Sequence, residues 1–290
     1  MSRGTTRSRP RAHRGTTLAA VDATTLRVEV DRRRPTARRL FAGLLEMSYV
    51  DLDDPMHLEF EYMRRIGDVL DLAWPAERSL AAVHLGGAAC TLARYLTATR
   101  PGSRSDVYER DERVVRIARE QLGLRPSRAL RVRLGDAREL LARRGDATAD
   151  VVIGDAFSGT DVPAHLLTVE FAREVRRVLR PDGTYVLNVI DAPPLSIARR
   201  QIATLLDVFS ELAVLATPRL LHGRASGNVV LLAADRTLPT VALAERAAHA
   251  PRPEQLLERD AAELFAPHAR AVRDEDVRGS GRGRSTAPAR

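Results

Sequence analysis

Short apolar runs alternate with amphipathic stretches through the centre of the chain. The apolar runs are followed by small or turn-forming residues, which predicts strands at residues 80–85, 105–109, 130–134, 150–154 and 184–190. Apolar residues at helical spacing fill the intervals. The expected helices begin near Ala89, Asp111, Ala137 and Val162. Strands that alternate with helices favour an α/β fold with a Rossmann-like, doubly wound parallel sheet.

A different pattern precedes this region. Residues 25–30 alternate apolar and polar side chains, which is typical of a half-buried strand, and residues 39–45 and 47–52 indicate one or two more. Residues 53–55 (Asp-Asp-Pro) then predict a helix start, because aspartate is a favoured N-cap and proline fits the first turn. Residues 21–75 are therefore expected to form a small N-terminal β subdomain with a linking helix.

The remaining segments complete the expected domain organisation. Residues 76–240 are expected to form the Rossmann-like domain that carries the chemistry, with apolar segments at 212–215 and 228–233 closing the edge of its sheet. Residues 241–266 are alanine-rich and helical in pattern. Both ends of the chain are rich in Arg, Gly, Ser and Pro and cannot bury enough apolar surface to offset the entropy of ordering. The predicted disordered tails are residues 1–20 and 267–290.

Composition narrows the class of protein. At 290 residues the chain can hold one large or two small domains, and it contains no apolar run long enough to span a membrane. The single cysteine, Cys90, excludes an intrachain disulfide framework and fits a reducing cytoplasm. The net charge is +8, but arginine supplies every basic side chain and alanine is abundant, which is typical of a GC-rich genome. We therefore expect a cytoplasmic protein with neither nucleic-acid nor membrane partners.

Glycines and carboxylates follow four successive strands of the predicted sheet. In chain order they are Gly86 with Gly87, Glu109, Asp136 with Ala137, and Asp155. The carboxyl ends of parallel strands meet at one edge of a sheet, where ligands bind, so these residues are expected to converge. Small residues let the backbone approach a ligand, and an acid at the end of the second strand accepts hydrogen bonds from a ribose. The sequence therefore predicts a nucleoside pocket.

Single residues of this set have alternative explanations. Asp136 is also a favoured helix N-cap, and Glu109 could pair with a neighbouring arginine. His84, inside an apolar strand, is expected to be a packed core residue, and Cys90 a small packing residue. The seven histidines lack ligand spacing and the cysteine has no partner, so no metal site is expected.

The pattern at the strand ends resembles the Rossmann-like fold of S-adenosylmethionine-dependent transferases. Residues 171–185 are similar to the helix, Leu-x-Pro-x-Gly turn and fifth strand of that class. Within the class, residues 48–52 (Ser-Tyr-Val-Asp-Leu) and 58–62 (Leu-Glu-Phe-Glu-Tyr) resemble the spermidine synthase (polyamine aminopropyltransferase) family. The resemblance covers about residues 26–234.

This resemblance implies transfer of an aminopropyl group from decarboxylated S-adenosylmethionine to a small amine of the polyamine type. Asp155 would be the catalytic carboxylate that takes up the proton of the amine. The residues implied to bind the donor are Gly86, Gly87, Glu109, Asp136 and Ala137. Those implied to line the acceptor site are Tyr62, Ser158 and Asp161, with Glu59 and Glu61 at its entrance. The resemblance also implies a homo-oligomer, since spermidine synthases are often dimers or tetramers.

The chain departs from the family pattern at three positions. Ala89 stands where the family's Gly-Gly-Gly-Asp-Gly turn has the aspartate that holds the aminopropyl nitrogen. Ser158 replaces the second acid of Asp-Ser-Ser-Asp-Pro, and Met47 stands where a glutamine commonly precedes Ser-Tyr. Charge-assisted hydrogen bonds are the strong ones, so these losses bear on polyamine specificity. Asp161 could substitute for the missing acid, or it could cap a helix.

Two alternatives stay open at this point. One is an S-adenosylmethionine-dependent methyltransferase of unknown acceptor on the same scaffold, which the alanine at position 89 would suit. The other is a non-catalytic nucleoside-binding homologue. The sequence contains neither a Ser/His/Asp triad signature nor a phosphate-binding P-loop.

Overall fold

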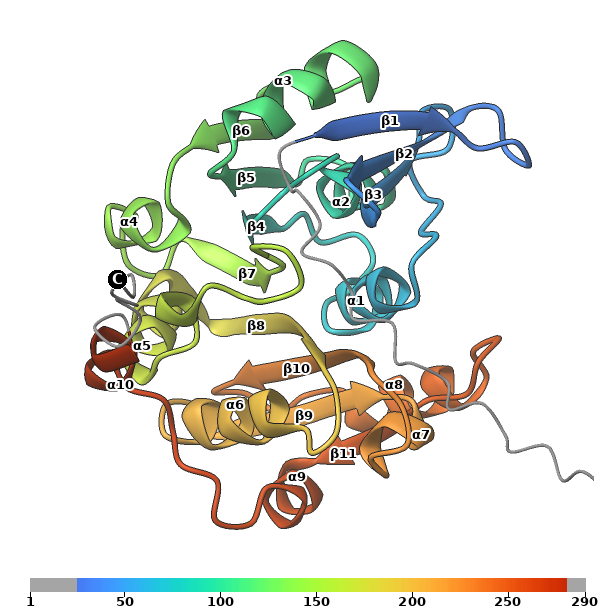
Figure 1. Ribbon diagram of the computed structural model, residues 1–290. Coiled ribbons are helices and arrows are strands. Elements are labelled where there is room, and N and C mark those ends of the chain that lie inside the picture. The colour runs from blue at the N-terminus through green and yellow to red at the C-terminus, as the bar shows by residue number, and fades with distance from the viewer. Residues whose placement is uncertain (1–24, 281–290) are drawn as a thin grey trace, which may run out of the picture.

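The computed structural model describes residues 25–280, so the tail predicted at 1–20 and the last part of the C-terminal tail, 281–290, lie outside the described residues. The described chain forms a three-stranded sheet and an eight-stranded sheet with helices on both faces (Figure 1). This arrangement confirms the predicted Rossmann-like α/β fold with a small β unit ahead of it.

The larger sheet has the strand order β11-β9-β10-β8-β7-β4-β5-β6. Its five parallel strands are β4 (Ala81–Leu85), β5 (Arg104–Glu109), β6 (Leu130–Leu134), β7 (Ala149–Gly154) and β8 (Leu179–Asp191). After β4 the chain builds outward through β5 and β6, and it then crosses back to place β7 on the other side of β4. The order of the strands therefore reverses between β4 and β7, and ligands of open α/β sheets bind at the carboxyl side of such a reversal.

The rest of this sheet is antiparallel. Strand β10 (Gly227–Ala234) pairs with β8 on one side and with β9 (Glu211–Ala216) on the other, which confirms the predicted strands at 212–215 and 228–233. The edge strand β11 (Gln255–Glu258) was not predicted from the helical pattern of 241–266. Its two leucines pack against the cores on opposite faces of the sheet, as the two-residue period of a strand requires.

Helices cover both faces of the large sheet. On one face lie α1 (Glu61–Leu72), α2 (Thr91–Thr99) and α8 (Thr240–Ala248). On the other lie α4 (Ala137–Ala142), η1 (Ala164–Leu166), α5 (Val169–Val178), α6 (Ser196–Leu206), α7 (Pro218–Leu221) and α9 (Arg259–Phe265). Alternate residues of β7 supply the two cores, with Val151 and Ile153 on one side and Val152 on the other. None of the helices in residues 25–280 is both long and apolar enough to cross a membrane.

The small sheet consists of β1 (Leu26–Val30), β2 (Ala37–Ala42) and β3 (Leu45–Asp51), all antiparallel. Its buried residues Leu40 and Val50 share a core with α2 and with α3 (Glu112–Gln121). Figure 1 shows this blue sheet beside α2 and α3. Residues of β1, β2 and β3 line the same cavity as Gly86, Glu109 and Asp155, which lie at the carboxyl ends of parallel strands. The predicted β subdomain therefore covers the edge of the large sheet at which a ligand is expected to bind.

The predicted start of the first helix at residues 53–55 was wrong, because α1 begins only at Glu61. The carboxylate of Asp51 accepts hydrogen bonds from the backbone N–H groups of Asp53 and Asp54, at 3.0 and 3.2 Å. It also pairs with the guanidinium of Arg34 at 2.6 Å. These bonds hold the segment as a turn. The apolar residues at helical spacing therefore belong to a helix only from Glu61 onward.

The described part of the predicted C-terminal tail is packed on the protein. Val272 is buried, and its carbonyl accepts a hydrogen bond of 2.8 Å from the backbone N–H of Val169. Asp274 forms a two-bond ion pair with Arg138 at 2.6 and 2.8 Å, and α10 (Asp274–Ser280) follows. The predicted boundary at residue 267 was therefore wrong. A hydrogen bond and an ion pair with residues of α5 and α4 hold this segment in place, although it has little apolar surface of its own.

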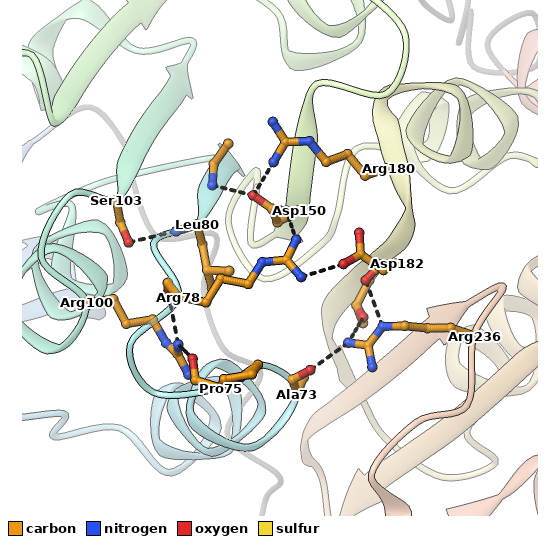
Figure 2. Close-up of polar contacts among 12 residues, drawn as sticks. Ala73, Pro75, Arg78, Leu80, Arg100, Ser103, Asp150, Arg180, Asp182 and Arg236 are labelled. Carbon is orange, nitrogen blue, oxygen red and sulfur yellow. Dashed lines mark hydrogen bonds and ion pairs between the residues drawn. The ribbon is translucent and has the colours of Figure 1, made fainter.

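A buried aspartate joins the amino-terminal ends of three parallel strands. Figure 2 shows Asp150, the second residue of β7, between the guanidinium groups of Arg78 and Arg180. Both ion-pair distances are 2.6 Å, and the carboxylate also accepts the backbone N–H of Ala81 at 2.7 Å. This contact fixes β4, β7 and β8 at the edge opposite to the expected ligand site.

Candidate active site

A cavity of about 1280 Å³ opens where the carboxyl ends of the parallel strands meet the small sheet and the start of α1. The predicted site residues that line it are Tyr62, Gly86, Gly87, Glu109, Asp136, Ala137, Asp155 and Ser158. Residues that follow four different strands therefore converge on a single hollow, as the strand-end pattern predicted.

Close packing of the turn against neighbouring strands requires the two glycines after β4, in addition to their role in letting a ligand approach the backbone. Gly86 has a φ of +86°, and a Cβ built on it would lie 2.5 Å from the carbonyl oxygen of Asp155. A Cβ on Gly87 would lie 2.2 Å from the side chain of Val107 on β5. Only glycine lets this turn sit against the ends of β5 and β7, and the same close fit brings the turn to the floor of the cavity.

Glu109 connects the glycine turn to the end of β5. One carboxylate oxygen accepts the backbone N–H groups of Gly87 and Ala88 at 3.2 and 3.3 Å, and the other accepts that of Asp111 at 2.9 Å. The neighbouring Arg113 pairs with Asp111. A carboxylate offers about four lone-pair directions, so Glu109 keeps acceptor capacity for a hydroxyl group of a ligand in the cavity.

Asp136 is both a helix cap and a residue of the cavity wall. One carboxylate oxygen accepts the backbone N–H groups of Arg138 and Glu139 at the start of α4, at 2.9 and 3.3 Å. The other contacts the ring nitrogen Nε2 of His165 at 2.9 Å. Partial burial raises the pKa of Asp136, but the hydrogen bonds from His165 and from α4 outweigh it, and the net pKa is lowered. The two explanations of this residue are therefore compatible.

Asp155 is the centre of a polar network at the end of β7. Its Oδ2 accepts a hydrogen bond of 3.0 Å from the hydroxyl of Tyr62, and its Oδ1 accepts one of 2.8 Å from the amide of Asn188. Asn188 in turn accepts a hydrogen bond of 3.0 Å from the amide of Asn228. Burial raises the pKa of Asp155 to about 6, against the opposing effect of the bonds from Asn188 and Tyr62. A carboxylate with a pKa near neutrality is suited to accept a proton from a bound substrate.

The two asparagines were not predicted from the sequence. Asn188 is fully buried in β8, and Asn228 is the second residue of β10. In the antiparallel register Asn188 faces Val230, two residues from Asn228. Diagonal neighbours of this kind are within reach of each other on one face of a sheet. The available signal was a single amide inside an apolar strand, because buried polar groups need partners.

Of the residues predicted to line an acceptor site, Asp161 is not in the cavity lining. Ser158 lines the cavity, whereas the exposed Asp161 lies outside it and pairs with Ser158 through backbone hydrogen bonds. Asp161 therefore neither replaces the missing carboxylate nor caps a helix, since η1 follows Pro163. Glu59 and Glu61 do line the cavity, and Glu61 forms an ion pair of 3.0 Å with Arg252.

The turn after β4, in which Ala89 stands, carries no acidic side chain. Ala89 is buried, and its backbone N–H lies 3.3 Å from the hydroxyl of Ser48.

Burial raises the pKa of the Cys90 thiol to about 12, so this residue is a packing group, as expected. Burial lowers the pKa of His84 to about 4, and its ring contacts Ser105 at 3.1 Å inside the sheet. His84 is thus a neutral, buried histidine.

Comparison with known proteins places the chain in a family. No family model matches it. A probable spermidine synthase from Corynebacterium glutamicum ATCC 13032 is 32% identical, with a TM-score of 0.80 over 86% of this chain and 92% of that one. The chain belongs to the spermidine synthase family.

Two further proteins are similar to this chain, one in sequence and one in fold. A polyamine aminopropyltransferase from Vibrio vulnificus (strain CMCP6) is 32% identical over 167 residues, which is 57% of this chain and 53% of that protein. The chain thus matches about half the length of that curated relative. A spermidine synthase in complex with the transition state analogue AdoDATO shares the fold at 18% identity, with a TM-score of 0.55 over 88% of this chain and 80% of that one.

Proposed function

We propose that this protein is an aminopropyltransferase that moves the aminopropyl group of decarboxylated S-adenosylmethionine onto a small amine. The observation that carries the proposal is the position of Asp155, which shares one cavity with the residues predicted to bind an adenosine group. Membership of the spermidine synthase family and the relative named as a polyamine aminopropyltransferase support the same reaction.

The donor would lie along the ends of β4, β5 and β6. The free lone pairs of Glu109 would accept hydrogen bonds from the ribose, and Asp136 with Ala137 would meet the amino edge of the adenine. Gly86 and Gly87 would let the backbone lie close to the sulfonium. These contacts hold the reacting carbon in a fixed place, which is the main contribution of a binding site to a displacement reaction.

The reaction requires a neutral amine, because an ammonium has no lone pair with which to attack. The amine nitrogen attacks the carbon next to the sulfonium, so that the C–N bond forms as the C–S bond breaks. The electron pair of the broken bond stays on sulfur, which leaves as the neutral thioether methylthioadenosine. Asp155 receives the proton lost by the nitrogen, and the hydrogen bond from Tyr62 orients its carboxylate for that transfer.

The acceptor would be a small amine that enters past the start of α1. Glu59 and Glu61 line that end of the cavity and can attract a second ammonium group of a diamine. Ser158 and Ala89 supply no charge there, so we infer looser selection among diamines than a site with two further acids would give. A lone cysteine can form no intrachain disulfide, which fits the cytoplasmic location that we infer. We also infer a homo-oligomer from family membership, to be checked by light scattering.

The decisive experiment supplies the purified protein with decarboxylated or intact S-adenosylmethionine and with putrescine, cadaverine or 1,3-diaminopropane. We expect methylthioadenosine and one aminopropylated amine by mass spectrometry, only from the decarboxylated donor. Release of S-adenosylhomocysteine from the intact donor would identify a methyltransferase instead. Tight donor binding by calorimetry without product from any amine would indicate a non-catalytic nucleoside-binding protein.

A further inference from the structure

Helix α1 contacts the Asp155 network at two points that lie one helical turn apart. Tyr62 donates directly to Asp155, and Arg65, three residues later, donates a hydrogen bond of 3.0 Å from Nη1 to the backbone carbonyl of Asn228. The side chain of Asn228 then leads back to Asp155 through Asn188. Helix α1 and the strands β10, β8 and β7 are therefore joined in a closed ring of hydrogen bonds.

Arg65 is itself held by a buried acid. Its Nε forms an ion pair with Glu254, and the two residues are 5% and 9% exposed. Glu254 lies just before β11, where its backbone N–H donates a hydrogen bond of 3.0 Å to the carbonyl of Ala247. Burying an ion pair is expensive, and an apolar pair of similar volume often stabilises a protein at least as well. The pair therefore calls for an explanation other than stability.

We propose that the buried Arg65–Glu254 pair positions Asp155 for proton transfer by fixing Asn228 and, through it, the amide orientation of Asn188. Arg65 and Glu254 are thus positioning residues that contact neither substrate. This role rests on the proposed function in one respect, namely that Asp155 receives the proton of the amine.

The orientation of Asn188 matters because its side-chain amide has a hydrogen-bond donor on one side and an acceptor on the other. Asn188 helps the carboxylate only when its NH₂ group faces Asp155, because its oxygen in that place would repel the charge. The donation from Asn228 to the oxygen of Asn188 selects the productive orientation. Asn228 stands near the start of β10, and the bond from Arg65 to its carbonyl holds that end of the strand against α1.

Charged groups of other elements also face the cavity around Asp155. They are Glu59, Glu61 and Arg64 around the start of α1, Glu109 at the end of β5, Asp136 after β6, and Arg252 ahead of β11; the neutral ring of His84 on β4 also lines the cavity. A substitution that keeps all of these groups in place isolates the effect of the ring of hydrogen bonds.

The test replaces the ion pair by apolar residues in the double variant Arg65→Met/Glu254→Leu, which leaves no unpaired buried charge. The matched control is Asp68→Asn/Arg246→Gln, since that pair also joins α1 to the C-terminal segment, at 3.1 Å, without touching the ring. The pKa of Asp155 is measured by carboxyl NMR titration, with Asp155→Asn to assign the signal, and kcat is measured across pH.

We expect the pKa of Asp155 to rise by about one unit in the apolar double variant, the size of effect given by a weakened hydrogen bond to a charged group. Because a smaller fraction of Asp155 is then ionised, kcat should fall by up to about tenfold at pH values below about 6, while the KM for the donor stays unchanged. The control pair should leave both quantities as in the wild type. A folded apolar variant with an unshifted pKa and pH profile would overturn the proposal.

A second variant tests the proposal without altering the ion pair, so it does not depend on whether the apolar double variant folds. Asn228→Ala removes only the amide that orients Asn188, and it should produce the same rise in the pKa of Asp155. An unshifted pKa in this variant also overturns the proposal. The NMR titration needs no turnover, so failure of the proposed function (wild-type protein that makes no product) is distinguishable from failure of the positioning role.

Discussion

The hydroxyl of Tyr62 donates a hydrogen bond of 3.0 Å to Oδ2 of Asp155, across 93 positions of sequence. The other carboxylate oxygen is engaged by Asn188 at 2.8 Å, so the ionised form of Asp155 is held from both sides. Each oxygen still has a lone pair that can face the cavity. The carboxylate is therefore fixed in direction while remaining able to accept one proton from a bound amine.

Replacing Asp155 by asparagine should remove catalysis and spare donor binding. The amide keeps the size of the side chain but cannot accept the proton, and loss of a general base typically costs about 10²- to 10⁴-fold in rate. Single-turnover measurement of methylthioadenosine release should show this loss in kcat. Calorimetry with methylthioadenosine should give a Kd within about threefold of the wild type, a difference well under 1 kcal/mol. A variant that retains most of its rate would exclude Asp155 as the base.

The pH dependence of activity should report Asp155. Its pKa of about 6 means that kcat/KM is constant above that value and falls as the pH drops through it, because the protonated acid cannot accept the proton of the amine. The bond from Tyr62 lowers this pKa, so Tyr62→Phe should move the acid limb to higher pH by about half a unit to one unit.

The matched control for this change is Tyr95→Phe. The hydroxyl of Tyr95 donates a hydrogen bond of 2.8 Å to Asp71, another tyrosine–aspartate pair, but one that lies outside the cavity lining. Its removal should leave the acid limb in place. Equal shifts in both variants would show that the limb follows overall stability and not the state of Asp155.

The convergence of the strand-end residues on one cavity could be anticipated from sequence because it depends on one property of parallel sheets. Residues after successive parallel strands must meet at the same edge, so Gly86, Glu109, Asp136 and Asp155 converge wherever the helices pack. No knowledge of loop structure was needed. The glycine turn itself carries a further constraint, contact with β5 and β7, that only coordinates reveal.

The surroundings of Asp155 depend on contacts that no local pattern encodes. Asn228 reaches Asn188 only because β10 returns antiparallel to β8 in one particular register. Asp161 seemed able to replace a carboxylate by spacing alone, but the turn at Ser158 directs it to solvent. The carboxylate of Asp51 likewise turned an apparent helix start into a loop. In each case a hydrogen bond outside the local pattern decided the outcome.

Replacing Glu109 by glutamine should weaken donor binding. The change keeps the shape but removes the charge that accepts the backbone N–H groups of Gly87 and Asp111 and, in the proposed function, a ribose hydroxyl. Hydrogen bonds to charged groups contribute about 1.5–3 kcal/mol. We expect the Kd for methylthioadenosine to rise about 10- to 100-fold. Glu112→Gln, in the first turn of α3, is the control and should bind as the wild type does. An unchanged Kd for Glu109→Gln would remove this residue from the donor site.

Replacing Asp150 by alanine should destabilise the fold without touching the cavity. The substitution leaves the backbone N–H of Ala81 without its partner and separates Arg78 from Arg180 at the base of β7 (Figure 2). We expect a loss of about 3 kcal/mol in the free energy of unfolding by urea titration. Asp146→Asn removes an ion pair to Arg177 whose acid is 75% exposed, and it should have no measurable effect. Equal losses in the two variants would contradict the role assigned to Asp150.

Replacing His84 by glutamine should make the stability less sensitive to acid. Burial lowers the pKa of His84 to about 4 in the folded state, against 6.5 for the free side chain, so the unfolded chain binds one more proton between these values. The wild type therefore has its full stability above pH 6.5 and loses it as the pH falls toward 4, by about 3 kcal/mol in total. Asp155, whose folded pKa is raised, acts in the opposite direction in both proteins and cancels in the comparison. Urea titrations from pH 4.5 to 7.5 should show a flatter profile for His84→Gln, and parallel profiles would mean that His84 is not held neutral by the fold.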